Sequence, residues 1–294
     1  MTISLGLQSC SDWVQPEKVG TETVFPWEED PETWNAYFDV LNVYKEREHS
    51  IVYASFRNAD DKGDGELNYM RNLPDRLDIV SLTNADRFSG HDLEDMEWMH
   101  RMGTKVLYQV DYAGRRDEFK DEASLGAYLD QVVASATEYG LDGFSFTGHP
   151  DFSGADPMAG KAASMLVGRL DLEDKLLVFE GNPQFIGAAD RERIDYYVLD
   201  TRTEEYEMDV KLAVQDARRL GIRDSRIILS SGMEGTMTDS DLQEVGQLDL
   251  ISSMALTQGP LAGIAVYGIE ADYYHSGENY AGMRRVIQKL NPAR

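Results

Sequence analysis

The feature that most constrains the fold of this chain is a repeated alternation between short apolar segments and amphipathic helical patterns. Each apolar segment is typical of a strand that is buried on both faces. The eight segments are Ile51–Phe56, Leu77–Leu82, Lys105–Val110, Gly143–Phe146, Leu176–Phe179, Tyr196–Leu199, Ile227–Leu229 and Ile264–Tyr267. The helical patterns between and after them include Leu93–Met102, Leu125–Tyr139, Pro157–Leu170, Tyr206–Leu220, Leu242–Leu248 and Tyr280–Leu290. Eight strands that alternate with helices predict an α/β protein with a (β/α)8 TIM barrel.

A doubly wound open sheet is the alternative arrangement for such an alternation. That fold usually carries a glycine-rich phosphate-binding turn after its first strand. Here the first strand runs into Phe56-Arg57-Asn58-Ala59, which contains no glycine. We therefore favour the barrel.

The segment before the first strand divides into a tether and a helix. Residues 11–30 contain two prolines and several acids without periodicity, and they predict a linker. Pro31 begins a helical pattern for which Asp30 is the expected N-cap. We expect one barrel domain over residues 31–294, preceded by this linker.

The single cysteine, Cys10, excludes an intramolecular disulfide bond. The run Leu7-Gln8-Ser9-Cys10 resembles the end of a bacterial lipoprotein signal, in which a small residue precedes an acylated cysteine. Residues 1–10 are thus interpreted as part of such a signal, with Cys10 as the lipid attachment site. This resemblance implies a lipid-anchored protein of the cell envelope, on the outer-membrane surface of a Gram-negative bacterium. The anchor is then the only predicted contact with the membrane.

The net charge of the chain narrows the range of binding partners that we expect. The chain has 28 Lys and Arg against 53 Asp and Glu, a net charge of -25, with the acids spread along the sequence. Such a field repels phosphate backbones, so we expect no nucleic-acid partner. The five histidines are scattered without metal-ligand spacing, and we expect neither a bound metal nor a cofactor.

In a barrel, functional side chains gather where the strands end. The predicted strand ends here are rich in carboxylates, amides and aromatic rings. Hydroxyl groups of sugars are bound by such polar groups, and sugar C–H faces pack on such rings. The candidate ligand-binding residues are Gln109, Asp111, His149, Glu180, Asn182, Asp200, Tyr267 and Asp272.

The fourth predicted strand carries the most specific pattern, Leu141-Asp142-Gly143-Phe144-Ser145-Phe146-Thr147-Gly148-His149. It resembles the DxxDxDxE signature of glycoside hydrolase family 18, the chitinases and endo-β-N-acetylglucosaminidases. Asp142 matches the first position. Ser145, Thr147 and His149 stand where Asp, Asp and Glu are expected.

The resemblance implies a mechanism that these residues cannot perform. In family 18 the final Glu protonates the glycosidic oxygen, while the preceding Asp orients the 2-acetamido group that attacks the anomeric carbon. Thr147 carries no charge to stabilise the cationic intermediate. His149 would be cationic beside a cation-like transition state. We therefore expect a very poor hydrolase by this route.

Two further segments resemble the same family. Tyr196-Tyr197-Val198-Leu199-Asp200 resembles its aromatic-rich sixth strand. Gly263-Ile264-Ala265-Val266-Tyr267-Gly268, followed by Asp272, resembles the last strand of endo-β-N-acetylglucosaminidase-like lipoproteins from gut Bacteroidetes. Both suggest that the barrel and the class of ligand that it binds are retained although the catalytic residues are replaced.

Three functions remain open from the sequence. The favoured one is a cell-surface protein that binds glycans containing N-acetylglucosamine (GlcNAc), such as N-glycans or chitooligosaccharides, without cutting them. The second is an active endo-acting glycosidase that uses displaced carboxylates, with Glu180, Asp200, Glu234 and Asp151 as candidates. The third is a structural scaffold among the partners of an outer-membrane glycan-uptake assembly.

Overall fold

The computed structural model describes residues 26–60, 65–154, 156, 158–274 and 277–292. The chain divides into two compact units, residues 1–37 and residues 38–294. The first unit contains α1 (Pro26–Glu29) and the start of α2 (Pro31–Glu46), where Asp30 accepts a hydrogen bond from the Thr33 amide. The helix predicted from Pro31 is confirmed. Within the predicted linker of residues 11–30, residues 26–29 are helical, and residues 11–25 lie outside the described part.

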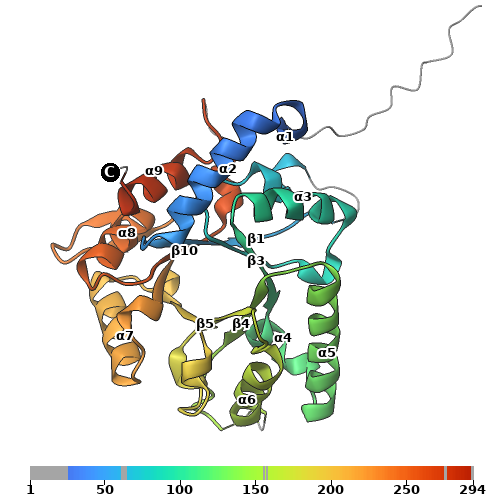
Figure 1. Cartoon of the computed structure of the whole chain (residues 1–294). Helices are drawn as coiled ribbons and strands as arrows, with labels where there is room; N and C mark the ends of the chain where they lie inside the picture. Colours follow the sequence, from blue (N-terminus) through green and yellow to red (C-terminus); the bar gives the residue numbers. More distant parts are fainter. Residues whose placement is uncertain (1–25, 61–64, 155, 157, 275–276, 293–294) are drawn as a thin grey trace, which may run out of the picture. The chain divides into compact units, whose positions relative to one another are not determined.

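The second unit contains a closed barrel of eight parallel strands, visible at the centre of Figure 1. Around the barrel the order is β1-β10-β7-β6-β5-β4-β3-β2. The strands are β1 (Ile51–Phe56), β2 (Ile79–Leu82), β3 (Lys105–Val110), β4 (Gly143–Gly148), β5 (Leu176–Gly181), β6 (Tyr196–Leu199), β7 (Ile227–Gly232) and β10 (Gly263–Tyr267). Each of the eight predicted segments overlaps one of these strands, so the TIM barrel is confirmed.

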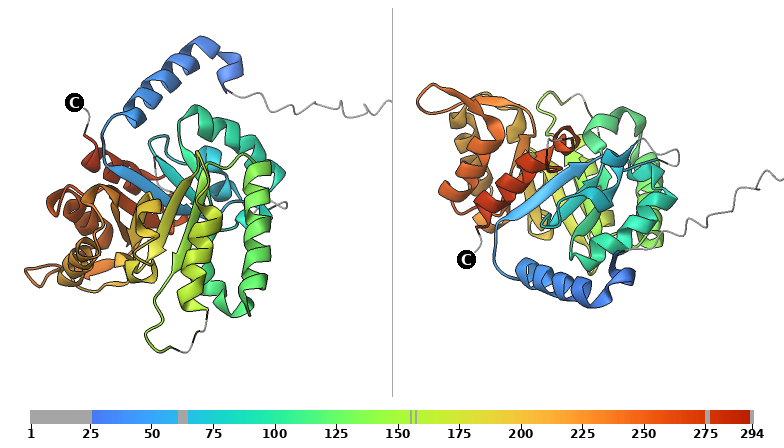
Figure 2. Two further views of the ribbon diagram at one scale, coloured as in Figure 1. Left: turned by 60° about the horizontal axis from the view of Figure 1, so that its bottom comes forward. Right: turned by 90° about the horizontal axis from the view of Figure 1, so that it is seen from above.

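Helices surround the strands in all three ribbon views (Figures 1 and 2). The longer ones are α3 (Gly90–Arg101), α5 (Glu122–Glu138), α6 (Ala159–Leu170), α7 (Glu207–Arg219), α8 (Gln247–Thr257) and α9 (Ala281–Leu290). The short α4 (Tyr112–Arg115) follows β3, and a 3-10 turn, η7 (Thr201–Thr203), follows β6. Five of the six helical patterns are confirmed within a few residues.

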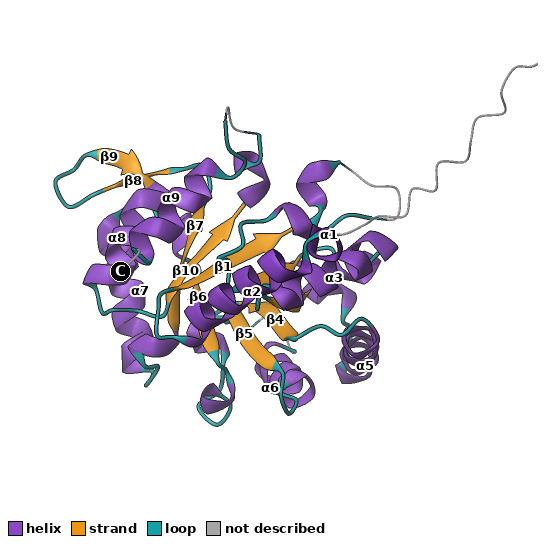
Figure 3. Cartoon of the chain, turned by 45° about the horizontal axis from the view of Figure 1, so that its top comes forward, coloured by secondary structure: helices purple, strands orange, loops and turns teal. Residues whose placement is uncertain are grey.

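The helix predicted over Leu242–Leu248 is wrong. Those residues lie in a hairpin of β8 (Thr236–Thr238) and β9 (Glu244–Gly246), which projects near α8 and α9 at the left of Figure 3, and in the start of α8. The Asp239 side chain accepts hydrogen bonds from the amides of Asp241 and Gln243, which closes the turn. Leu242 has a φ of 60°, a left-handed conformation that ends helical periodicity.

Alternate strand residues fill the barrel interior. The buried interior cluster consists of Tyr53, Ile79, Leu107, Val178, Val198, Ile228, Ala262 and Ala265. Residues two positions further along several strands, among them Ser55, Ser81, Gln109 and Ser145, share this inward orientation because side chains alternate along a strand. The next layer toward the carboxyl ends of the strands is therefore polar.

The amino ends of the strands are held by three carboxylates, of which Asp78 is buried and the other two are half-buried. Asp78, Asp142 and Asp195 each directly precede an even-numbered strand, β2, β4 or β6. Each accepts a hydrogen bond from an amide of the preceding strand: Val52 at 2.8 Å, Val106 at 2.9 Å and Leu177 at 2.8 Å, respectively. We call this set the aspartate staples.

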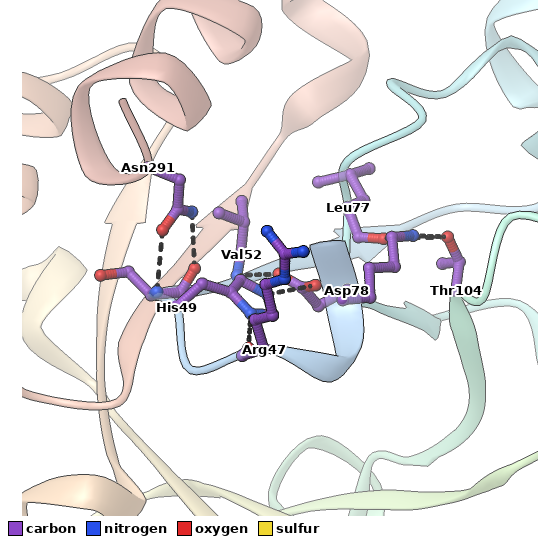
Figure 4. A network of polar contacts seen from close by, with 9 residues as sticks. Arg47, His49, Val52, Leu77, Asp78, Thr104 and Asn291 are labelled. Atoms are coloured by element: carbon purple, nitrogen blue, oxygen red, sulfur yellow. Dashed lines mark hydrogen bonds and ion pairs between the residues drawn. The ribbon is translucent and has the colours of Figure 1, made fainter. Parts of the chain in front are cut away.

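The staple at Asp78 belongs to the larger network shown in Figure 4. His49 Nε2 lies 2.8 Å from Asp78 Oδ1, and Lys45 Nζ donates to the Leu77 carbonyl and to Thr104 Oγ1. Asn291, after α9, accepts from the Ser50 amide and donates to the Ser50 carbonyl, both at 2.8 Å. The last described segment of the chain is thereby fixed to the entry of the first strand.

Candidate functional site

The inward row of β4 contains hydroxyl groups where the signature has carboxylates. Ser145 Oγ lies 2.7 Å from Ser81 Oγ, and both side chains are fully buried. Thr147 Oγ1 donates to Asp111 Oδ1 at 2.7 Å and accepts from the Ala113 amide at 2.9 Å. These contacts hold the loop after β3 against β4.

Asp142, the matching first position of the signature, is remote from this end of the barrel. It is one of the aspartate staples at the amino ends of the strands, where it also contacts His100 Nε2 at 3.1 Å and Lys105 Nζ at 3.0 Å. Burial alone would raise the pKa of Asp142, but the hydrogen bonds from His100 and Val106 and the charge of Lys105 hold the pKa below its usual value. Its role in this structure is to hold β3 against β4.

A buried carboxylate lies in the barrel interior, on the carboxyl-end side of the apolar layer. Glu180, at the end of β5, is 4% exposed. Its Oε1 accepts from the Tyr53 hydroxyl at 2.6 Å and its Oε2 accepts from the Tyr267 hydroxyl at 2.6 Å. Gln109 Nε2 lies 3.1 Å from both oxygens.

We call these hydrogen bonds the Glu180 network. They join strands that lie on opposite sides of the barrel interior. β1 and β5 are four strands apart in a ring of eight, so the bond between Tyr53 and Glu180 spans the barrel. Burial, followed by the charge of Glu180, raises the pKa values of Tyr53 and Tyr267 well above their usual range, so both hydroxyls remain donors. A carboxylate that already receives hydrogen bonds on both oxygens is suited to holding the barrel rather than to giving a proton to a ligand.

Arg202 covers the outer side of this network. Its guanidinium carbon lies 3.8 Å from the centre of the Tyr267 ring, and its Nε lies 3.3 Å from Asp200 Oδ1. The Arg202 amide and the Thr201 hydroxyl are bound by Ser230 of β7, which fixes the turn η7. Asp200 and Arg202 thus form a ridge beside the interior network.

A groove of about 390 Å³ lies on the other side of that ridge, between the loop after β5 and helix α7. Three predicted ligand-binding residues, His149, Asn182 and Asp200, line it. Its remaining wall includes Gly181, Pro183, Gln184, Leu199, Thr203, Glu204, Asp209, Leu212, Ala213, Asp216, Ala217 and Leu220. We call it the α7 groove.

The predicted ligand-binding residues therefore fall into separate places. Gln109, Glu180 and Tyr267 meet in the interior, Asp111 lies at the rim beside Thr147, and the α7 groove collects three others. Asp272 lies in none of these three places. It is 3% exposed and accepts hydrogen bonds from the amides of Gly282 and Met283 at the start of α9. Its position stabilises that helix.

Two of the displaced carboxylates, Glu234 and Asp151, have surroundings other than the Glu180 network. Glu234 is exposed in the loop after β7, where it lines a second groove of about 500 Å³ beside the β8–β9 hairpin. Asp151 accepts hydrogen bonds within its own loop: its Oδ1 accepts from the Ser153 amide and its Oδ2 from the Asp156 amide. Cys10 lies outside the described residues.

Sequence reasoning missed Tyr53 and Glu204, and it placed Arg202 only among the polar residues at the end of the sixth strand. Tyr53 lies in the middle of a predicted strand, and its inward parity with Ser55 was available from alternation alone. Arg202 and Glu204 follow the sixth strand within a few residues, but no pattern distinguishes them from solvated loop charges. Only the packing of η7 brings them to the mouth of the barrel.

Two kinds of feature are absent from the described residues. Among them, no group of three or more His, Cys, Asp or Glu side chains is arranged to hold a metal ion. Within the same part of the chain, no helix combines the length and the apolar character that crossing a membrane requires.

The fold and these strand ends define a (β/α)8 barrel with a polar, carboxylate-centred interior. Comparison with known proteins finds a family model that is similar to part of the chain: residues 15–131 match glycoside hydrolase family 18, BT1044-like. The matched part contains β1 to β3 but ends before β4 and its degenerate signature. No curated protein is significantly similar to the chain in sequence.

Solved structures resemble the fold over most of its length. A selenomethionine form of BT1044 with one Glu replaced by Gln is 19% identical, with a TM-score of 0.71 over 90% of this chain and 95% of that one. An endo-β-N-acetylglucosaminidase from Cordyceps militaris is 20% identical, with a TM-score of 0.68 over 87% and 96%. A chitinase from Bacteroides thetaiotaomicron is 12% identical, with a TM-score of 0.59 over 83% and 97%. At these low sequence identities, the structural similarity shows that the fold is shared.

Proposed function

We propose that this chain is a member of glycoside hydrolase family 18 that binds GlcNAc-containing glycans and has lost most or all of its hydrolytic activity. The family match and the shared barrel support the ligand class. The Cordyceps militaris enzyme has also been solved with fucosyl-N-acetylglucosamine-Asn, in a variant with an Asp and a Glu two positions apart replaced. Thr147 and His149 have the same spacing in this chain.

One observation carries the loss of activity: the inward row of β4 offers no carboxylate. Thr147 is engaged by Asp111 and by the Ala113 amide, and His149 is exposed. Losing a general acid removes a proton-transfer contribution of about 10²–10⁴-fold in rate. Losing the electrostatic partner of the acetamide adds a further factor of about 10²–10³.

We favour binding over the alternative of displaced carboxylates because of the contacts of Glu180 and Glu234. Retaining glycosidases place two carboxyl groups about 5–5.5 Å apart, both free to face the sugar. The oxygens of Glu180 are occupied by Tyr53, Gln109 and Tyr267, whereas Glu234 lines the second groove. Among the described acids, these two therefore have separate surroundings.

A paired assay tests the proposal. The protein is incubated with N-glycoproteins and with chitooligosaccharides, released sugar is measured, and binding to the same glycans is measured by calorimetry. Binding without release is expected. Glycan release at an enzyme-like turnover would establish the displaced-carboxylate alternative, and neither binding nor release would favour a scaffold.

A restored variant sharpens the result. Thr147→Asp with His149→Glu returns the two missing carboxyl groups and is expected to gain measurable hydrolysis. Because Asp111 Oδ1 lies 2.7 Å from Thr147 Oγ1, the new Asp would face a like charge, so a triple variant that adds Asp111→Asn is the better design. The control is Asp111→Asn alone. A folded triple variant that binds glycan but cuts none would show that more than these positions has been lost.

We further propose display on the outer-membrane surface by a lipid on Cys10, where the protein serves glycan-uptake partners. The support is the sequence Leu7-Gln8-Ser9-Cys10. Fractionation of cells that express the natural full-length protein tests it. Membrane association that disappears in Cys10→Ala is expected, whereas an unchanged distribution would contradict the anchor.

A further inference from the structure

We propose that Phe152 and Tyr274 are stacking surfaces for sugar rings on opposite sides of the barrel mouth, so that the protein binds an oligosaccharide that crosses the mouth rather than a single terminal sugar. This inference rests on the proposed glycan binding and adds the extent of the ligand and two residues that hold it. It is supported by the exposure of the two rings, by the way each ring is held, and by their separation around the barrel.

Both side chains present an aromatic ring to solvent. Phe152 is 80% exposed and Tyr274 is 72% exposed, and among the aromatic side chains of the described residues these two are the most exposed. Sugars pack their C–H faces on flat aromatic rings, which removes apolar surface of both partners from water. The two rings therefore have the chemistry and the accessibility that sugar stacking requires.

Tyr274 is held in place by a cluster of aromatic rings. Its ring meets the ring of the buried Tyr273 edge to face, with centres 4.7 Å apart, and Tyr273 meets Tyr280 in the same manner at 5.4 Å. The Tyr273 hydroxyl donates to Glu66 Oε2 at 3.2 Å, which ties the cluster to the loop after β1. A ring that is positioned before the ligand arrives loses less conformational freedom on binding.

Phe152 projects from a turn that is fixed by its own hydrogen bonds. The carboxylate of the preceding residue, Asp151, accepts from the Ser153 amide at 2.9 Å and from the Asp156 amide at 2.6 Å. Hydrogen bonds from the Ser153 side chain and from the Asp156 amide lower the pKa of Asp151 to about 2, so the carboxylate that holds the turn is charged at neutral pH. This exposed ring is also positioned by its surroundings.

The two rings belong to opposite sides of the barrel. Phe152 follows β4 and Tyr274 follows β10, and these strands are four positions apart in the ring of eight, as Figure 1 shows. Eight strands about 4.8 Å apart and tilted by about 36° make a ring about 15 Å across. A single sugar is too short to contact both side chains, whereas a linear oligosaccharide can reach from one to the other.

The strand ends between the two rings carry polar groups that can bond to such a chain. Asp111 and Thr147 lie together at the ends of β3 and β4, and His149 is exposed just beyond them. Toward the other side, the Arg202 guanidinium lies over the ring of Tyr267 in β10. These groups can donate to or accept from sugar hydroxyls and acetamides. Aromatic contacts at both ends with polar contacts between them fit an extended GlcNAc chain.

Calorimetry with chitooligosaccharides from chitobiose to chitohexaose tests this inference. We expect the affinity of the wild-type protein to rise with chain length, and Phe152→Ala and Tyr274→Ala each to reduce chitohexaose affinity about tenfold. Chitobiose is too short to reach both rings, so no more than one of the two variants is expected to weaken it.

The outcomes separate this inference from the proposed function. Unchanged chitohexaose affinity in either folded variant would overturn the inference while leaving glycan binding intact. Equal losses of chitobiose affinity in both variants would also overturn it, because the rings would then not lie on opposite sides of the ligand path. If the wild-type protein binds neither chitooligosaccharides nor N-glycans, the proposed function fails and this inference fails with it.

Matched variants show whether a flat ring is what the ligand requires. Phe152→Leu keeps an apolar side chain without the ring and is expected to bind chitohexaose as weakly as Phe152→Ala, whereas Phe152→Tyr keeps the ring and the wild-type affinity. Val40→Ala removes a similarly exposed apolar side chain from α2 and is the control, with no change expected. Full affinity in Phe152→Leu would overturn stacking. Ring removal that alters the oligomeric state but not glycan affinity would assign the rings to a protein contact instead.

Discussion

The two ends of the barrel use carboxylates in opposite ways. At the amino ends, three Asp side chains each hold one strand to its neighbour through a backbone amide, and the same arrangement is repeated at β2, β4 and β6. At the carboxyl ends, one Glu gathers side chains from β1, β3 and β10, and other acids line open grooves. The difference teaches that a carboxylate in a family signature can belong to the scaffold: Asp142 matches the signature but lies at the amino end.

The largest expected effect is at the carboxyl end. Glu180→Ala leaves the Tyr53 hydroxyl, the Tyr267 hydroxyl and the Gln109 amide without their acceptor inside the barrel. We expect the free energy of unfolding to fall by about 2–4 kcal/mol. Urea denaturation measures it, with Glu180→Gln as the isosteric comparison and about half the loss. A neutral outcome for Glu180→Ala would mean that the network does not hold the barrel.

Next in size is the corresponding change at the amino end. Asp142→Ala removes the acceptor of the Val106 amide and the partner of His100 and Lys105, and we expect a loss of about 1–3 kcal/mol. Asp142→Asn keeps an acceptor for Val106 and is expected to lose less. Denaturation and calorimetry are done on the same samples. A change in glycan affinity without a change in stability would place Asp142 in the binding site and erase the contrast between the two ends.

A smaller effect is expected from pH at the amino end. The hydrogen bond to Asp78 raises the pKa of His49 above its ordinary value, against burial, which lowers it. The folded state therefore holds this proton more tightly than the unfolded state. The stabilisation is complete below about pH 6.5 and is lost as pH rises through the raised pKa.

Thermal melts from pH 5.5 to 8.5 test this titration. The wild-type protein is expected to lose more stability across that range than His49→Gln does. Parallel melting curves for the two proteins would show that His49 does not contribute to the pH dependence.

The smallest effect is expected at the hairpin beside the second groove. Leu242 is 79% exposed and has a φ of 60°, which costs an L-residue with a bulky side chain more than it costs Asn. We expect Leu242→Asn to raise stability by about 0.5–1 kcal/mol, measured by urea denaturation. Leu242→Ala is the control, because it removes the same side chain without a residue that favours this conformation. An equal gain from both would attribute the effect to lost exposed apolar surface.

The sequence predicts the scaffold better than the site for a physical reason. A buried strand is marked by a local run of mostly apolar residues such as Ile51–Phe56. Such a run is enough to predict the strand, because side chains on both of its faces are buried. The aspartate staples were also visible as apolar-Asp pairs, Leu77-Asp78, Leu141-Asp142 and Ile194-Asp195, directly before the even strands. Of the three, only Asp142 falls within a pattern that resembles a known signature, so the other two look like ordinary acids at the start of a strand.

The site depends on contacts between distant segments. Glu180 is joined to Tyr53 and Tyr267 across sequence separations of 127 and 87 residues, and nothing local marks these partners. The α7 groove needs the turn η7 between β6 and α7, whose position is set by Ser230 of β7. The helix predicted over Leu242–Leu248 failed for a local reason instead, since its turn-forming Asp239 lay just outside the pattern.

The spacing of the aspartate staples has a mechanical consequence. They join β1 to β2, β3 to β4 and β5 to β6, whereas the described contacts include no equivalent carboxylate between β2 and β3 or between β4 and β5. The first six strands are thereby grouped into three doublets, and the junctions between doublets are the natural lines along which the barrel would open under force or partial denaturation. Asn291, bonded twice to Ser50, fastens the segment after α9 to the start of β1, the strand that pairs with β10 where the barrel closes.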